Sequence, residues 1–159
     1  MMVRLNNFYY GTPGCGKTTM VNKYPNVFID SDEIYNMVAK SHIKLDCEPH
    51  ETGRILYNMH KSGEIENFWT IVNDTVEELK ELRKKKIILT SNFFTIGLCS
   101  VLYLYDPEIR SLRFRENAIR QNSDNFNFDN LMKREDKNSH EARVYYLKEN
   151  EYLSDILSV

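Results

Sequence analysis

The chain has 159 residues, of which 42% are hydrophobic and 28% are charged, and its net charge is −2. This length suits one domain with a hydrophobic core, and the nearly balanced charge excludes a polycation built to coat nucleic acid. No apolar run approaches the roughly 20 residues of a membrane span, and the first residues lack the apolar stretch of a secretory signal. The three cysteines, Cys15, Cys47 and Cys99, are too widely spaced for a disulfide framework or a zinc site. We therefore expect a single cytoplasmic domain that does not bind membranes.

Glycines are concentrated near the amino terminus, where residues 11–19 read GTPGCGKTT. This segment matches the pattern Gly-x-x-x-x-Gly-Lys-[Ser/Thr], and it stands between a β-prone aromatic run at residues 7–10 and a predicted helix at residues 18–23. The glycines permit backbone angles that turn successive N–H groups inward, and the start of the helix adds a dipole that favours phosphate. We predict that residues 11–18, which we call the glycine loop, bind phosphate groups, as loops of this pattern do in kinases, motor ATPases, switch GTPases and non-catalytic regulators.

The side chains of this segment have distinct predicted roles. Lys17 can reach the outer phosphates, and the Thr18 hydroxyl is placed to ligate Mg²⁺, which bridges the phosphates during transfer. The predicted nucleotide-binding residues are Gly11, Thr12, Pro13, Gly14, Cys15, Gly16, Lys17, Thr18 and Thr19.

The next segments predict an acidic turn and a long crossover helix. Residues 27–29 have the pattern of a short buried strand, and Asp30-Ser31-Asp32 follows, so that two carboxylates stand at the carboxyl end of this strand. From residue 62 onward, apolar residues recur at helical spacing up to the basic residues 83–86, and a strand is predicted at residues 87–90. The apolar residues of this predicted helix are Phe68, Ile71, Val72, Val76, Leu79 and Leu82.

The last third of the chain predicts two further strands with an arginine-rich helix between them. The strands are predicted at residues 101–105 and 142–147, and a short closing helix is predicted at residues 151–157. Residues 121–130 are rich in Asn and Asp, which indicates a loop or hinge. The arginines that follow the fourth strand are Arg110, Arg113, Arg115 and Arg120.

Short apolar strands that alternate with helices indicate a parallel α/β sheet with helices on both faces. Ligands of such sheets bind at the carboxyl ends of the strands. The glycine loop, residues 30–32, residues 90–92 and the segment after Tyr105 would all lie along that edge. We therefore expect phosphate-binding, acidic and arginine-rich segments at one rim of the sheet.

With these motifs the chain resembles the small P-loop kinases, a group that includes adenylate, shikimate, gluconate and polynucleotide kinases. The resemblance covers nearly the whole chain as a pattern of elements, and the glycine loop is its specific part. It implies one domain over residues 1–159, folded as a three-layer sandwich around a five-stranded parallel sheet of order 2-3-1-4-5. It also implies an acceptor-binding region at residues 36–66 and a lid-like region at residues 110–140.

The same resemblance assigns roles to residues outside the glycine loop. The acidic turn is similar to the Asp-x-Asp turn of shikimate and gluconate kinases, so Asp30 would support the metal shell and Asp32 would orient or deprotonate an acceptor hydroxyl. The arginines of the lid-like region resemble those that close over ATP and steady the transferring phosphoryl group. They are Arg113, Arg115 and Arg120. Residues 147–157 would lie where such kinases pack the adenine.

The chain departs from these kinases in the segments that would recognise the acceptor. Tyr35 stands where polynucleotide kinases commonly have an arginine, and residues 91–93 read SNF where shikimate kinases have three glycines. Residues 52–57 are similar to a helix in the nucleotide-binding insert of adenylate kinase. There Arg54 could bind an acceptor phosphate as a fork, with an ordinary exposed helix arginine as the equal alternative.

Three functions remain open at this point. The first is an ATP- and Mg²⁺-dependent kinase that moves the γ-phosphoryl group to a nucleotide-type acceptor, namely a nucleoside or deoxynucleoside monophosphate. The second is a hydroxyl kinase that acts on a polynucleotide 5′ end or a small metabolite, with Asp32 as the base. The third belongs to another class, a non-catalytic ATP-binding regulator. The oligomeric state is open.

Overall fold

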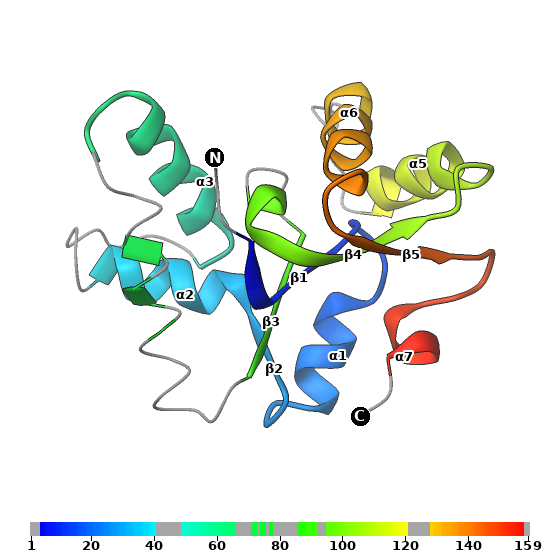
Figure 1. The fold of residues 1–159 in the computed structure, drawn as a ribbon, viewed down its shortest axis with the longest axis horizontal. Coiled ribbons are helices and arrows are strands. Elements are labelled where there is room, and N and C mark those ends of the chain that lie inside the picture. Colours follow the sequence, from blue (N-terminus) through cyan, green and yellow to red (C-terminus); the bar gives the residue numbers. More distant parts are fainter. Residues whose placement is uncertain are drawn as a thin grey trace.

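The computed structural model describes residues 4–40, 49–65, 71–72, 74–75, 77, 86–91, 95–120 and 128–157. In this part of the chain five strands form one sheet in the order β2-β3-β1-β4-β5, and every neighbouring pair is parallel (Figure 1). The strands are β1 Leu5–Gly11, β2 Phe28–Asp30, β3 Ile87–Thr90, β4 Cys99–Tyr105 and β5 Arg143–Leu147. The predicted parallel sheet and its order are therefore confirmed.

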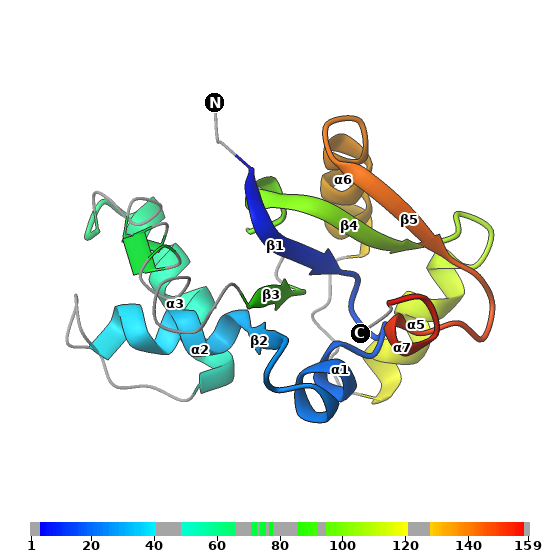
Figure 2. The same cartoon turned by 60° about the horizontal axis from the view of Figure 1, so that its bottom comes forward.

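Helices cover both sides of this sheet. They are α1 Lys17–Lys23, α2 Ser31–Val38, α3 Pro49–Lys61, α5 Arg110–Arg120, α6 Phe128–Ser139 and α7 Leu153–Ile156, with a 3-10 turn at Ile96–Leu98. In Figures 1 and 2, α1 and α7 lie on one side of β4 and β5, and α6 lies on the other. None of the described helices has the length and apolar character that crossing a bilayer requires.

The sequence patterns locate the strands better than the helices. We predicted a loop up to residue 130, but α6 begins at Phe128 and runs to Ser139, where no helix was expected. At the carboxyl end, α7 occupies only the middle of the predicted segment 151–157. Part of the predicted crossover helix is helical, at residues 71–72, 74–75 and 77. At its predicted start, residues 62–65 form a turn after α3 and are not helical. Phe68, Val76, Leu79 and Leu82 lie outside the described residues.

Two hydrophobic clusters hold the helices against the sheet. Phe8 and Tyr10 of β1 are fully buried in the first cluster, to which α2 and α3 contribute. The second cluster contains Met20 of α1, Phe114 of α5 and Leu153 of α7, all buried. Because β1 is the central strand, its two faces are packed from opposite sides, and its carboxyl end is fixed among α1, α5 and α7.

The strand register brings the carboxyl ends of the strands to one edge of the sheet. Tyr10 is paired with Thr90 of β3, and Gly11 is paired with Tyr103 of β4. Asp30, the last residue of β2, is paired with Leu89. The end of β1 and the end of β2 are therefore separated only by β3, so the predicted rim of glycine, acid and arginine segments is present in the described residues.

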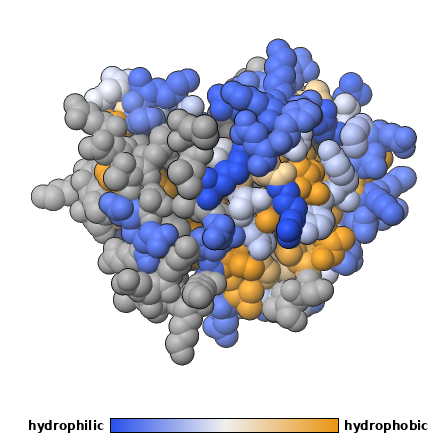
Figure 3. Space-filling view, viewed as in Figure 1, coloured by the Kyte–Doolittle hydropathy of each residue, from blue (hydrophilic) through white to orange (hydrophobic). Residues whose placement is uncertain are grey.

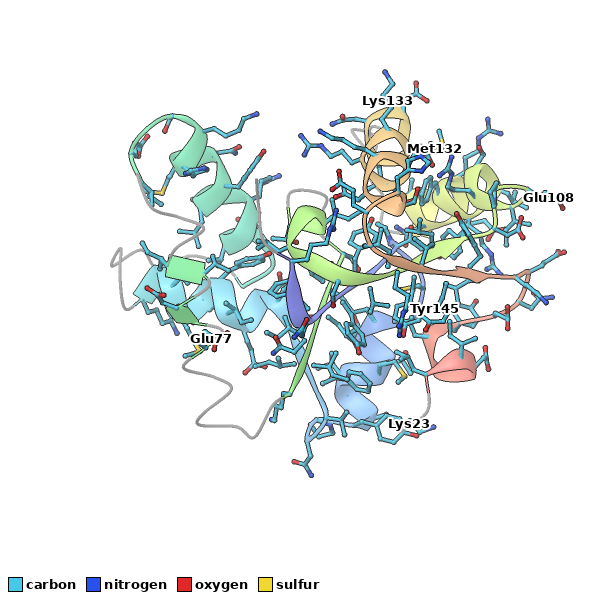
Figure 4. The ribbon with its side chains drawn as sticks, viewed as in Figure 1. Lys23, Glu77, Glu108, Met132, Lys133 and Tyr145 are labelled. Carbon is cyan, nitrogen blue, oxygen red and sulfur yellow. The ribbon has the colours of Figure 1, made fainter. Side chains whose placement is uncertain are left out.

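The face of the molecule drawn in Figure 3 has a hydrophilic and an apolar part. Hydrophilic side chains cover the corner formed by α5 and α6, whereas apolar surface lies over α1 and the region of α7. Tyr145 of β5 lies on the α1 side (Figure 4) and stacks on Tyr103 of β4 at 5.4 Å between ring centroids. Tyr103 and Tyr145 therefore form part of the face on which α1 and α7 pack.

Candidate functional site

The glycine loop connects β1 to α1 at the carboxyl edge of the sheet. Gly14 and Gly16 have φ angles of 89° and 94°, in the left-handed region that glycine adopts without a steric penalty. A Cβ atom at Gly14 would lie 2.8 Å from the hydroxyl oxygen of Tyr105, which leaves no room for a side chain. Left-handed residues of this kind let successive N–H groups point toward one anion.

The loop is fixed by hydrogen bonds with β4 and with Ser91, the residue that follows β3. Each bond involves a backbone group of the loop, so the path of the main chain is held directly. The bonds are Thr12 N–H to Tyr103 O at 3.0 Å, Tyr105 hydroxyl to Pro13 O at 3.0 Å and Ser91 hydroxyl to Gly11 O at 2.7 Å. Within the loop, Cys15 N–H donates to Thr12 O at 3.1 Å.

The closing turn of the chain also contacts the loop. Leu153 N–H of α7 donates to Cys15 O at 2.8 Å, and the Leu153 side chain is fully buried. Tyr152 lies against Gly16, where a Cβ atom would be 3.5 Å from that of Tyr152. The structure thus brings the segment that the resemblance placed near the adenine directly to the glycine loop.

Cys15 is buried within the loop and does not reach solvent. Burial raises the pKa of its thiol to about 12, and the opposing effect of Lys17, which lowers the pKa, is smaller. The thiol therefore stays protonated at neutral pH and acts as a small apolar group.

Lys17 and the acidic turn meet at the edge of the sheet. The Lys17 ammonium lies 3.4 Å from both carboxylate oxygens of Asp30. Asp30 also accepts a hydrogen bond from the Asp32 N–H at 3.0 Å and so caps α2. The structure therefore brings together Lys17 and the acidic turn, two features that were predicted separately from the sequence.

The residues predicted to hold Mg²⁺ fit that ion chemically. Thr18 lies in the first turn of α1, and Asp30 lies beside Lys17 at the same edge. The described residues contain no cluster of three or more His, Cys, Asp or Glu side chains that could hold a metal. Mg²⁺ does not need such a cluster, because it commonly uses one or two protein oxygens together with substrate phosphates and water. Thr18 and Asp30 would hold the ion.

The three predicted lid arginines have different surroundings. The Arg113 guanidinium lies 5.8 Å from the ring centre of Tyr105 and 5.7 Å from that of Tyr152, and both tyrosines contact the glycine loop. Arg115 is exposed on α5, and the side chain of Arg120 lies outside the described residues. Arg113 is thus the predicted lid arginine that the structure places against neighbours of the loop.

Arg54, the predicted acceptor-binding arginine, lies on α3 with 70% of its side chain exposed, 3.9 Å from Glu51. Its helix is joined to α2 by a hydrogen bond from the Thr52 hydroxyl to Asn36 at 2.7 Å. The structure therefore places Arg54 on the element next to the acidic turn, and it does not bring the guanidinium to Lys17 or to Asp30 through any described contact.

A further ionisable group, Glu135 of α6, lies beneath the loop and was not among the predicted residues. Glu135 is fully buried, and one carboxylate oxygen accepts hydrogen bonds from the Tyr10 hydroxyl at 2.7 Å and the Thr12 hydroxyl at 2.8 Å. Its other oxygen has no hydrogen-bond partner in the described part of the chain. Burial raises the pKa of Glu135 to about 7, although the two hydrogen bonds and Arg110 lower it.

The sequence contains only a weak signal for Glu135. Residues 133–137 read KREDK, a pattern typical of a solvated helix face. The one helical clue is Leu131, which precedes Glu135 by four positions and is also buried. Lys133 projects from the top of α6 away from the sheet (Figure 4), so the charged run is divided between two faces of the helix.

Comparison of the chain with protein-family models and with curated proteins finds no match. The function is therefore inferred from the residues of the site and their geometry.

Proposed function

We propose that the chain is an ATP- and Mg²⁺-dependent phosphotransferase that moves the γ-phosphoryl group to a nucleotide-type acceptor. The observation that carries this proposal is the position of Lys17. The lysine follows two glycines with left-handed backbone angles, and its ammonium lies 3.4 Å from Asp30. Asp30 ends β2, which is separated from β1 by β3 alone. A loop of this form with a lysine and a hydroxyl residue is suited to hold a polyphosphate beside a metal ion.

In this proposal the chain stabilises charge and excludes water, with no covalent intermediate. A bound Mg²⁺ would neutralise part of the charge on the phosphates. Lys17 binds the outer phosphates, and the backbone N–H groups of the glycine loop bind the others. Arg113, held against Tyr105 and Tyr152, supplies a further positive charge near the loop.

Two classes of acceptor are candidates. A nucleoside or deoxynucleoside monophosphate is already ionised, and Arg54 on α3 would bind its phosphate. A hydroxyl acceptor, either a polynucleotide 5′ end or a small metabolite, needs a base, and Asp32 would serve as that base. The position of Asp32 in the first turn of α2, two residues after Asp30, which pairs with Lys17, is the observation that favours the second class.

A screen with γ-labelled ATP tests the proposal. Nucleoside monophosphates, nucleosides, 5′-hydroxyl oligonucleotides and small hydroxy acids are offered to the wild type in the presence of Mg²⁺. We expect label transfer to one of these classes and no transfer by Lys17→Ala. ATP binding without transfer to any acceptor would instead indicate the non-catalytic regulator.

Two further variants distinguish the acceptor classes. With a hydroxyl acceptor, Asp32→Asn should lose transfer but still bind ATP, whereas Arg54→Ala should have little effect. With a monophosphate acceptor, Arg54→Ala should raise the KM for the acceptor, and Asp32→Asn should retain turnover. Unchanged turnover in Asp32→Asn would remove Asp32 from the mechanism.

A further inference from the structure

We infer that Glu135 is a positioning residue for the glycine loop: from α6, its carboxylate holds the Thr12 hydroxyl and so keeps the loop in its phosphate-binding conformation. The effect on the loop is independent of any reaction. Its consequence for nucleotide binding rests on the function proposed above.

The Glu135 carboxylate contacts both β1 and the glycine loop. A single oxygen of Glu135 accepts two short hydrogen bonds, one from Tyr10 near the end of β1 and one from Thr12, the second residue of the loop. All three side chains are fully buried. The carboxylate therefore fixes the last part of β1 and the first part of the loop to α6, and 123 residues of sequence separate Thr12 from Glu135.

Thr12 is held by three hydrogen bonds. Its hydroxyl donates to Glu135, its N–H donates to Tyr103 of β4 and its carbonyl accepts from Cys15. The carbonyl bond closes the turn that leads to Gly14 and Gly16. The hydrogen bond to Glu135 is the only described side-chain hydrogen bond of Thr12. Its loss would leave both backbone hydrogen bonds of Thr12 in place.

An acid at this position is energetically costly. A carboxyl group buried without a positive partner in contact is expensive, and an apolar residue would fill the same space at lower cost. The charged and titratable groups that act on Glu135 are Tyr10, Cys15, Arg110 and Asp136. Of these, Tyr10 donates a hydrogen bond to it, whereas Arg110 forms its ion pair with Asp136 at 2.7 Å. The hydrogen bonds that offset the cost of burying Glu135 come from two hydroxyl groups, one of which belongs to the loop.

The contact also joins the loop to the arginine-bearing helix. The Arg110–Asp136 ion pair ties the start of α5 to α6, one residue from Glu135. Figure 4 shows Met132 on the side of α6 that faces α5, and Met132 packs with the cluster that contains Phe114 of α5. The helix that carries Arg113 and the loop that carries Lys17 are thus both fixed to α6.

Hydrogen exchange on the protein without nucleotide tests the positioning role directly. Thr12→Val removes the hydroxyl at nearly constant volume, and Thr12→Ser keeps it as the matched control. At pH 8, where the Glu135 carboxyl is mostly ionised, we expect amides of residues 11–18 to exchange about tenfold faster in Thr12→Val, because a hydrogen bond to a charged group is lost. Thr12→Ser should restore the slow rate. Exchange in α2 and α3 should not change, which shows that the variant is folded.

A double-mutant cycle shows whether the effect passes through Glu135. In the Glu135→Gln background the bond from Thr12 is no longer charge-assisted, so Thr12→Val should accelerate loop exchange much less than in the wild type. Equal acceleration in both backgrounds, or equal loop exchange in Thr12→Val and Thr12→Ser, would overturn the inference.

Titration with MgATP separates this inference from the proposed function. We expect Thr12→Val to bind MgATP about tenfold more weakly than Thr12→Ser. If no variant binds MgATP but loop exchange responds as described, the positioning role holds and the proposed function fails. If MgATP binds equally to both variants and loop exchange is unchanged, the positioning role is wrong while the proposed function stands.

Discussion

Cys15 shows how burial decides the chemistry of a single residue. Cys15 stands two residues before Lys17 in the glycine loop. A neighbouring lysine ordinarily favours a reactive thiolate. In this loop, however, the thiol is fully buried, and the pKa of Cys15 is raised to about 12 because burial outweighs the effect of Lys17. Cys15 is thus a packing residue of the loop rather than a nucleophile.

We predict that Cys15 is not alkylated by iodoacetamide in the folded protein at pH 7.5. Thr19→Cys, which places a thiol at an exposed position two residues beyond Lys17, should react at the rate of an ordinary cysteine. Mass spectrometry of the peptide that contains both positions measures the two rates. Rapid alkylation of Cys15 without unfolding would show that the thiol is accessible, and it would contradict the burial described here.

At the scale of the elements, α7 is short, yet it both packs in the core and holds the glycine loop. It contributes a fully buried leucine to the second hydrophobic cluster and a backbone hydrogen bond to the glycine loop. Its first turn is closed by a hydrogen bond from Tyr152 N–H to Asp155 at 2.7 Å. A helix of one turn is not stable alone, so α7 depends on its packing against the loop, and the loop depends on α7.

We predict that Leu153→Ala lowers the free energy of unfolding by about 2–5 kcal/mol, the usual cost of truncating a buried leucine. Leu112→Ala removes the same atoms from α5 at a position that is 57% exposed, and it should change stability by less than about 0.5 kcal/mol. Urea unfolding of the two variants and the wild type measures the difference. Similar losses in both variants would mean that α7 does not pack as described.

The elements also show what the sequence could and could not reveal. The strands were predictable because short apolar runs end at polar residues, glycine or proline. The glycine loop was predictable because the spacing of its glycines, lysine and threonine is specific. α6 was not predictable, because Leu131 and Glu135 face inward among residues that read as a charged surface. Glu135 itself depends on a contact with Tyr10 and Thr12 more than 120 residues away, and no local pattern contains that information.

At the scale of the whole molecule, Glu135 links stability to pH. Its pKa is raised from 4.5 to about 7 because the folded protein buries it. Between these pH values the folded protein binds more protons than the unfolded chain, so the free energy of unfolding falls as the pH rises from about 4.5 to about 7. A shift of this size corresponds to roughly 3 kcal/mol over the whole window.

We predict that Glu135→Gln removes much of this dependence. Relative to the wild type, the variant should gain stability between pH 5 and pH 8, since an amide does not lose a proton. Urea unfolding at both pH values measures the gain, and Glu149→Gln, which removes an exposed acid, serves as the control and should follow the wild type. If Glu135→Gln and the wild type change in parallel with pH, the buried carboxyl does not titrate in this range.

The supports of the glycine loop also determine when it can form during synthesis. The loop itself is complete early, but its contacts come from Ser91, Tyr103 and Tyr105, then from Glu135, and finally from Leu153. A chain that emerges from its amino end cannot assemble this loop until almost all of the described residues have been made. Contacts over such long sequence separations also slow folding. The glycine loop should therefore reach its folded conformation late on the ribosome and nearly all at once.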